Sequence, residues 1–202
     1  MTPEIFAIFP EPIYKIKLNR VFTKEENTFF IKRKSNVRKN EGNITGLDNF
    51  VLNFKEMKNL HNNLIEVIND YFIKVIETDN KITPYITHSW LNYTKKGQNH
   101  HSHNHSNSII SGVIYINADK NCDNIKFEKR GNVIDFNPAR FNLFNSTSWF
   151  FPVETYDIIL FPSYLYHKVE IKQGTNERTS LAFNVFVKGT IGSGLTFTEL
   201  NL

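Results

Sequence analysis

The pattern of apolar residues changes near Pro84, and this change constrains the fold more than any other feature of the chain. Before it, apolar residues recur every three or four positions from about residue 55 to residue 77, which predicts an amphipathic helix. After it, short runs rich in β-branched and aromatic residues are separated by Gly, Asn, Asp and Pro. These runs predict strands at 86–93, 109–117, 124–128, 157–161, 168–172 and 180–187.

A helix followed by many short strands favours a mainly β (α+β) fold, an antiparallel sandwich or barrel with helices packed on one face. A shorter helix is expected after Thr23, which can cap its N-terminus, and residues 13–18 alternate as in an extended strand. The 202 residues, 40% of them hydrophobic, suffice for one packed core. We therefore predict a single domain, 1–202, with a helical support region at 1–84 and a β core at 85–202.

Composition excludes several classes of protein. Cys122 is the only cysteine, so neither an internal disulfide nor a cysteine-only zinc site can form. No run of about 18 apolar residues could span a membrane, and the N-terminus lacks the pattern of a signal peptide, so we expect a cytoplasmic protein. The formal net charge of +4 does not by itself indicate nucleic acid, and the basic run at 32–39 is interpreted as a solvated face.

Four of the seven histidines lie within six residues: His100, His101, His103 and His105. Residues two apart on an extended chain point to the same side, so His103 and His105 can bind one metal ion together. Imidazole binds Fe, Zn, Cu and Ni, so the pair does not select a metal. The alternative is a polar loop with imidazoles that bind nothing. His100 and His101 are candidates to assist the pair.

Two further polar residues stand beside apolar runs. His167 follows DIILFPSYLY and could either join the histidine pair or be a core imidazole bonded to a carbonyl. Arg178 precedes the apolar run LAFNVFV, and burial of a guanidinium is unfavourable unless it meets an anion. That anion could be an Asp or Glu of the protein, or the carboxylate of a ligand to which Ser180 donates a further hydrogen bond.

Three segments carry a family resemblance: GQNHHSHNHSNSIISGVIYIN, YDIILFPSYLYHKVE and ERTSLAFNVF. In this order they resemble the signature blocks of the 2-oxoglutarate and Fe(II)-dependent oxygenases, in particular a branch of small proteins from bacteria and phages. IFPEPIY near the start and GTIGSGLTFTEL near the end also resemble that branch, so the resemblance extends over nearly the whole chain. Its specificity lies in the combination of His-x-His, FPS followed by His, and Arg-x-Ser.

The resemblance implies a double-stranded β-helix, a jelly roll that binds Fe(II) and 2-oxoglutarate at its mouth. It implies that His103, His105 and His167 are the metal ligands. Arg178 would pair with the far carboxylate of 2-oxoglutarate, helped by Ser180 and Tyr115. The implied reaction uses dioxygen to oxidise a substrate, by hydroxylation, and releases succinate and CO2.

Other residues are candidates by strand position. Trp90 and Asn92 lie at alternate positions of the predicted strand 86–93, just before the histidine cluster, and could face the site or be core and rim residues. Asn184 has the same strand parity as Arg178 and Ser180 and could contact the ligand, or could instead satisfy a backbone group. The apolar Phe161, Leu181 and Phe183 are expected to line the barrel around the guanidinium.

The second ligand position departs from the family pattern. The superfamily usually carries Asp or Glu where this chain has His105. Either three imidazoles bind the metal, or water takes the place of His105; we expect three imidazoles. A second departure is Tyr156, which stands where Gly is common before Asp157.

Two other functions compete with the oxygenase. A cupin-like protein would hold Zn or Ni through three histidines without turnover, but such a site needs no carboxylate clamp of the kind that Arg178 and Ser180 would form. An adaptor would use the basic run at 32–39. The substrate, a small molecule or a peptide, is not identified by the sequence. We expect no membrane or nucleic-acid partner, and an open sheet edge would permit a homodimer.

Overall fold

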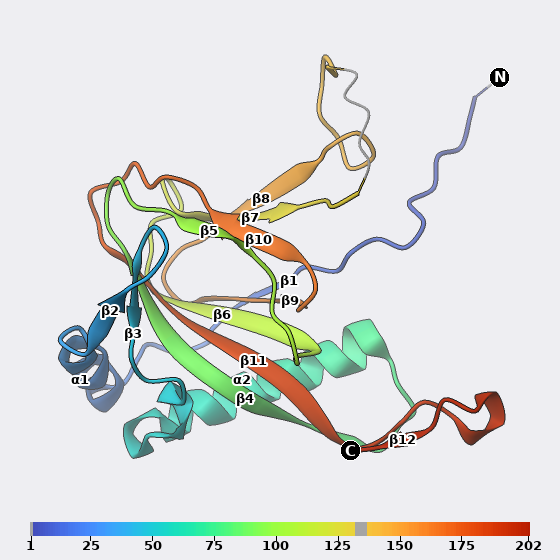
Figure 1. Cartoon of the computed structure of the whole chain (residues 1–202), viewed down its shortest axis with the longest axis horizontal. Helices are drawn as coiled ribbons and strands as arrows, with labels where there is room; N and C mark the ends of the chain where they lie inside the picture. The colour runs from blue at the N-terminus through green and yellow to red at the C-terminus, as the bar shows by residue number, and fades with distance from the viewer. Residues whose placement is uncertain (1, 132–136) are drawn as a thin grey trace.

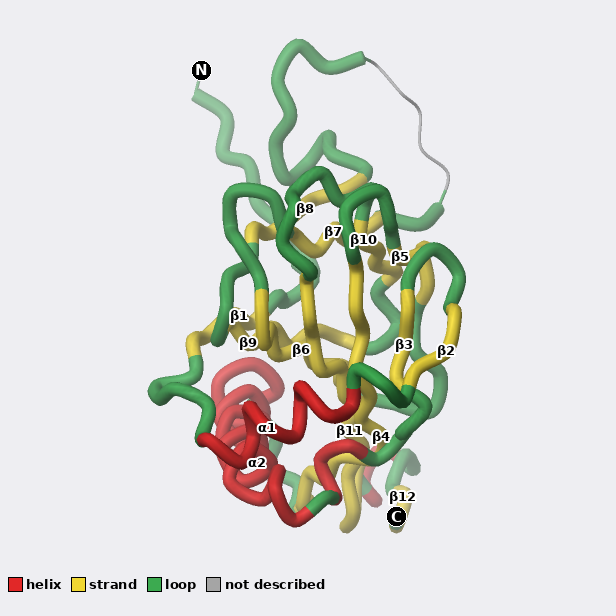
Figure 2. The backbone as a smooth tube through the Cα atoms, turned by 90° about the vertical axis from the view of Figure 1, so that its left-hand side faces the viewer, coloured by secondary structure: helices red, strands yellow, loops and turns green. Residues whose placement is uncertain are grey.

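The protein is described here by a computed structural model of residues 2–131 and 137–202. Two antiparallel sheets face each other, and the helices lie against the larger sheet on the side away from the smaller one (Figure 1, Figure 2). None of the helices in these residues is both long and apolar enough to cross a membrane.

The larger sheet has eight strands in the order β1-β9-β6-β11-β4-β3-β2, with β12 paired to β11. Its strands are β1 (Tyr14–Lys17), β2 (Val37–Lys39), β3 (Ile44–Gly46), β4 (Ile82–Thr94), β6 (Ile110–Asn117), β9 (Asp157–Pro162), β11 (Arg178–Ile191) and β12 (Leu200–Asn201). The smaller sheet has the order β5-β10-β7-β8. Its strands are β5 (His100–His103), β7 (Asn124–Glu128), β8 (Ser148–Pro152) and β10 (Tyr166–Val169).

The chain passes back and forth between the two sheets from β4 to β11. The strands β4, β6, β9 and β11 lie in the larger sheet, and β5, β7, β8 and β10 lie in the smaller one. Eight strands wound in this way form a jelly roll, so the expected mainly β fold is confirmed. The first 84 residues contain more than helices, because β1, β2 and β3 extend the larger sheet.

Two α-helices precede the jelly roll, α1 (Lys24–Arg33) and α2 (Lys58–Tyr71). Thr23 caps α1 as expected: its hydroxyl accepts from the Glu26 amide, and the Glu26 carboxylate accepts from the Thr23 amide. The predicted helix at 55–77 is shorter in its α-helical part. A 3₁₀ turn, Lys55–Met57, precedes it, and a π-helical segment, Phe72–Ile76, follows it. Two further 3₁₀ turns are Val51–Asn53 and Gly194–Thr196.

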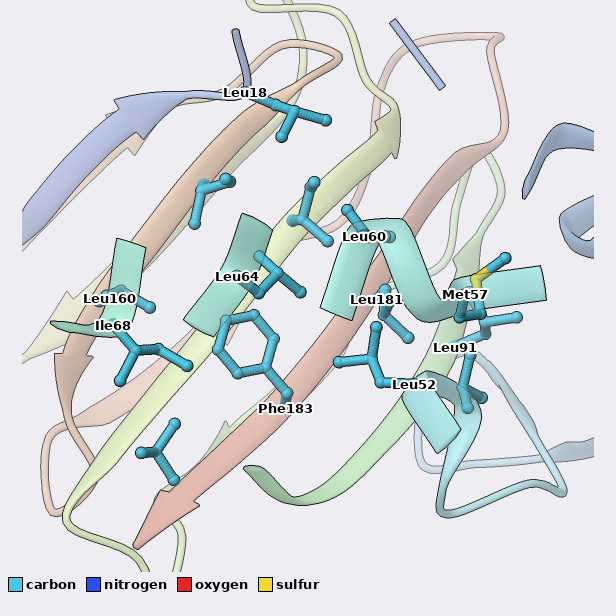
Figure 3. Close-up of a cluster of buried hydrophobic side chains, with 14 of the residues drawn as sticks. Leu18, Leu52, Met57, Leu60, Leu64, Ile68, Leu91, Leu160, Leu181 and Phe183 are labelled. Atoms are coloured by element: carbon cyan, nitrogen blue, oxygen red, sulfur yellow. The ribbon is translucent and has the colours of Figure 1, made fainter. Parts of the chain in front are cut away.

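Helix α2 covers the outer face of the larger sheet. Its Leu60, Leu64 and Ile68 are fully buried and face Leu181 and Phe183 of β11 (Figure 3). Full burial of one such side chain contributes about 1.5–3 kcal/mol, so this stripe is a large part of the core. The expectation that Leu181 and Phe183 line the barrel is therefore wrong. Side chains alternate along a strand, and odd-numbered residues at this part of β11 face the helix.

A second core lies between the two sheets. It contains Val113 and Tyr115 of β6, Phe127 of β7, Ile159 and Phe161 of β9, and also Ile125, Val153 and Ala182. Phe161 thus lies inside the barrel, as expected. The even-numbered residues at the start of β11 face this interior, and this places Arg178 between the sheets.

Tyr156, directly before β9, occupies a backbone position whose geometry favours glycine. Tyr156 has a φ of 77°, in the left-handed region that glycine adopts without a steric penalty. Its amide donates to the Tyr115 carbonyl over 2.8 Å, and its ring packs 5.0 Å from Phe22. The backbone geometry that favours glycine is therefore retained here with a tyrosine whose ring is packed.

Candidate active site

The first two imidazoles meet because their strands are paired. His103 ends β5 and lies directly opposite His167 on the neighbouring strand β10. The centroids of the two rings are 4.4 Å apart. His167 also packs 4.7 Å from the Phe161 ring, in the core between the sheets.

His105 completes a group of three. It lies just after β5, where its amide donates to the Ser163 carbonyl over 2.9 Å and so fixes the backbone. Its ring centroid is 5.0 Å from that of His103 and 5.1 Å from that of His167. One ring nitrogen from each of the three lies within 4.8 Å of the others, which is close enough for a single metal ion. We call this group the triad.

Backbone carbonyls orient two of the three rings. Nδ1 of His103 lies 2.9 Å from the His101 carbonyl, and Nδ1 of His167 lies 3.0 Å from the Leu165 carbonyl. A carbonyl only accepts hydrogen bonds, so each Nδ1 carries the proton and each Nε2 keeps its lone pair. Such outer hydrogen bonds hold a histidine in the tautomer and orientation that a metal requires.

The triad is neutral at physiological pH. Burial, with a smaller contribution from the neighbouring His103, lowers the pKa of His167 to about 3 and the pKa of His105 to about 4. Burial also lowers the pKa of His103 itself. Neutral imidazole is the form that binds metals, so the site is prepared for a cation without the loss of protons.

Arg178 faces the triad from the larger sheet and has no acidic partner among the described residues. It is 4% exposed. Its Nη2 donates to the Tyr115 hydroxyl over 3.3 Å, and its guanidinium carbon lies 5.0 Å from the centre of the Tyr115 ring. Its buried Nε has no hydrogen-bond partner. The sequence left two anions open as partners of Arg178, a carboxylate of the protein or a carboxylate of a ligand. In the described part of the chain, no Asp or Glu pairs with this guanidinium.

Two other predicted residues stand beside Arg178. Ser180 is buried and lies opposite Asn92 on β4 in the strand register, and opposite Tyr115 on β6. Asn92 Oδ1 is buried without a hydrogen-bond partner. These groups share one pocket, which is lined by Trp90, Asn92, His100, His103, His105, Gly112, Val113, Ile125, Phe161, His167, Lys168, Val169, Arg178, Ser180 and Ala182.

The structure does not bring Asn184 to this pocket. Its Oδ1 accepts a hydrogen bond from the Ser111 hydroxyl over 2.9 Å, and Ser111 in turn contacts Ser163. Asn184 is six residues from Arg178 along β11, roughly 20 Å of extended chain, so equal strand parity does not make the two neighbours.

Sequence reasoning left two pocket residues undecided. His100 lines the pocket and stacks on His103 with ring centroids 4.6 Å apart. Its spacing of three from His103 would place it on the opposite face of a regular strand, so no sequence signal indicates this contact. The ring centroids of Trp90 and His105 are 5.5 Å apart, and the spacing of two between Trp90 and Asn92 is the sequence signal that both face the site.

The sequence comparison indicates a family. The family model described as "Putative 2OG-Fe(II) oxygenase" matches residues 88–184, a segment that contains the triad and Arg178. The matched segment is just under half of the chain, and it is similar in sequence to the 2OG-Fe(II) oxygenases. No curated protein matches the sequence.

Solved structures of oxygenases share the fold. A 2OG-Fe(II) oxygenase family oxidoreductase from Burkholderia pseudomallei is 13% identical with a TM-score of 0.57, covering 85% of this chain and 84% of that one. HygX from Streptomyces hygroscopicus, with nickel, 2-oxoglutarate and hygromycin B bound, is 11% identical with a TM-score of 0.58, covering 87% and 82%. A prolyl hydroxylase from Trichoplax adhaerens, in complex with a hypoxia-inducible-factor peptide, is 12% identical with a TM-score of 0.59, covering 86% and 83%.

The pocket residues fit the cofactors of the 2OG-Fe(II) oxygenases, Fe(II) and 2-oxoglutarate. Three neutral imidazoles converge within ligand distance of one another, and imidazole nitrogen is a ligand for Fe(II). A buried guanidinium with an unpartnered Nε fits a carboxylate, which it can bind with two parallel hydrogen bonds.

Proposed function

We propose that the oxygenase hydroxylates an unidentified substrate through one metal held by His103, His105 and His167, with Arg178 binding 2-oxoglutarate. The observation that carries this proposal is the shared pocket, where three neutral imidazoles and an unpaired buried guanidinium face each other from opposite sheets. We also propose that residues 1–202 form one oxygenase domain.

In this proposal Arg178 neutralises the far carboxylate of 2-oxoglutarate. Tyr115 holds the guanidinium in place through its hydroxyl and its ring face. Ser180 and the unpartnered Asn92 Oδ1 share the pocket with the guanidinium, so Ser180 can donate to a bound carboxylate while Asn92 selects the orientation of a ligand. Asn184 would act only by supporting the strand. When bound, Fe(II) and 2-oxoglutarate supply dioxygen activation, coupled to the release of succinate and CO2.

The apolar part of the pocket excludes water. Val113, Ile125 and Phe161 are nearly or fully buried and line it from both sheets. A dry pocket strengthens the attraction between Arg178 and an anion, because the effective dielectric constant is lower than in water. Trp90, which is partly exposed beside His105, can contact a substrate at the mouth.

The cupin-like alternative explains the triad and leaves the rest of the pocket unexplained. A metal held for stability requires neither a buried guanidinium without an acidic partner nor a buried amide oxygen without a hydrogen bond. Both groups are energetically unfavourable as they stand, and a dicarboxylate would satisfy the guanidinium.

Anaerobic reconstitution tests the proposal. The protein is mixed with Fe(II) and then with 2-oxoglutarate without oxygen, and the visible absorption is recorded. We expect the charge-transfer band of a chelated keto acid, followed by succinate release when oxygen is admitted. His167→Ala should abolish both signals, whereas the control His61→Ala, on α2, should retain them.

A second outcome would support the cupin-like protein instead. If the protein binds Fe(II) with the triad intact but gives neither the band nor succinate, the oxygenase reaction is contradicted.

The cytoplasmic location, a bacterial or phage origin and a homodimer stay predictions from the sequence.

A further inference from the structure

A second group of three histidines lies beside the triad. His100, His101 and His103 all belong to β5, and we call them the β5 cluster. One ring nitrogen from each lies within 4.8 Å of the others. The ring centroids are 5.1 Å apart for His100 and His101, 4.6 Å for His100 and His103, and 4.9 Å for His101 and His103.

A bulge in β5 creates this cluster. Opposite β10, His103 pairs with His167 and His100 pairs with Val169, so β5 has one more residue in this stretch than its partner. In a regular strand, residues three apart point to opposite faces. The extra residue turns the chain, so His100 stacks on His103. Bulges next to active sites commonly re-aim a side chain in this way.

An independent observation also points to a ligand. Nδ1 of His101 is buried and has no hydrogen-bond partner, and such an atom is unfavourable unless something binds it. The carboxylate of Glu41, in the turn between β2 and β3, approaches this nitrogen to 3.9 Å. That turn is fixed against the cluster, because the Asn99 amide donates to the Gly42 carbonyl over 3.0 Å.

We propose that the β5 cluster is a second metal site, which binds Zn²⁺ in competition with the triad. Three imidazoles with one carboxylate are a ligand set that suits tetrahedral Zn²⁺, and Glu41 is the available carboxylate. A Zn²⁺ ion bound through Nε2 of His100 would displace the Asn40 side-chain amide, which lies 3.3 Å from that nitrogen. The zinc site itself goes beyond the proposed function, and only its competition with the triad rests on that function.

The competition follows from His103, which belongs to both groups. Its Nδ1 is engaged with the His101 carbonyl, so Nε2 is its single free ligand atom. An Nε2 lone pair binds one ion at a time. Occupation of the β5 cluster therefore removes His103 from the triad. Excess Zn²⁺ would then inhibit the oxygenase in two ways, by replacing the metal of the triad and by withdrawing one of its ligands.

Zinc binding by a variant without the triad tests the proposal. His105→Ala with His167→Ala leaves the β5 cluster intact, and calorimetry with ZnCl2 on the metal-free variant should give one Zn²⁺ per chain. Addition of His101→Ala should weaken this binding at least tenfold. Addition of His61→Ala, a matched histidine on α2, should not change it. Circular dichroism establishes that each variant is folded.

His167 is buried, so the double variant could fail to fold. The single variant His105→Ala, whose site lies in a loop, then provides the same comparison. In that background His101→Ala should again weaken Zn²⁺ binding at least tenfold, and His61→Ala should not. Equal Zn²⁺ affinity with and without His101 in a folded variant would overturn the proposal.

Discussion

Replacement of Arg178 by Met separates ligand binding from folding. The guanidinium is 4% exposed and has no acidic partner among the described residues. A charge-assisted hydrogen bond contributes about 1.5–3 kcal/mol, so the loss of two should weaken 2-oxoglutarate binding by about 3–6 kcal/mol, roughly 10²- to 10⁴-fold. Metal binding by the triad should change little. Without ligand, the variant should be at least as stable as the parent, because an unpaired buried charge is removed.

Thermal unfolding measures both effects. With Fe(II) in the absence of oxygen, 2-oxoglutarate at 100 times its Kd should stabilise the parent by about 2.7 kcal/mol. For a chain of this size that corresponds to a rise in Tm of about 5–11 °C. Arg178→Met should lose this rise, whereas Arg38→Met, which alters an exposed arginine of β2, should keep it.

Two results would refute this reasoning. A variant with the full ligand-induced rise would mean that Arg178 does not bind the carboxylate. A variant that is about 3 kcal/mol less stable than the parent without ligand would mean that the guanidinium has a structural partner.

Three further predictions concern the same site and its support. The pKa of His167 is lowered to about 3 and that of His105 to about 4, from 6.5, so the unfolded chain takes up these protons first as the pH falls. The metal-free protein should therefore lose stability below about pH 6.5, by up to about 1.4 kcal/mol per pH unit for each histidine. Urea unfolding at pH 7 and pH 5 measures this loss, and equal free energies of unfolding at the two pH values would contradict the neutral state of the imidazoles. His105→Asp should retain Fe(II) but lower the preference for Zn²⁺ or Cu²⁺ in metal competition, because a carboxylate is a harder ligand. Lys172→Ala should destabilise the protein by about 3–5 kcal/mol, because it leaves the buried Asp123 carboxylate without its cation. In the parent, Lys172 Nζ lies 2.5 Å from Asp123 Oδ1. A loss of less than about 1 kcal/mol in the free energy of urea unfolding would refute this prediction.

The long elements could be predicted because their pattern is local. Helix α2 carries its apolar stripe in its own sequence, and the Thr23 cap needs only the following turn. β5 carries no such pattern: its sequence, HHSH, has no apolar residue, and it is a strand because β10 pairs with it. β2 and β3 are three residues each and were missed for the same reason.

The site was predictable where side-chain parity holds. The spacing of two predicts that His103 and His105 point together, and the same spacing relates Arg178 to Ser180. Parity fails for His100, because the bulge that brings it to His103 depends on the register with a strand more than 60 residues away. Parity also says nothing of distance, which is why Asn184 lies outside the pocket.

The missing carboxylate of the triad changes the charge of the pocket as a whole. None of the described residues that line it is acidic, and Arg178 is a permanent cation. A divalent metal held by three neutral imidazoles would therefore give the pocket a charge one unit more positive than a site with two histidines and a carboxylate. Coulomb interactions are strong in a dry pocket. The bound metal would therefore strengthen the binding of the dianionic cosubstrate more here than in a site with two histidines and a carboxylate. Thermodynamic linkage is reciprocal, so the bound cosubstrate would raise the affinity for the metal by the same factor. If the three imidazoles hold the metal as proposed, a histidine at position 105 makes metal retention depend more strongly on the bound cosubstrate, which Arg178 would anchor.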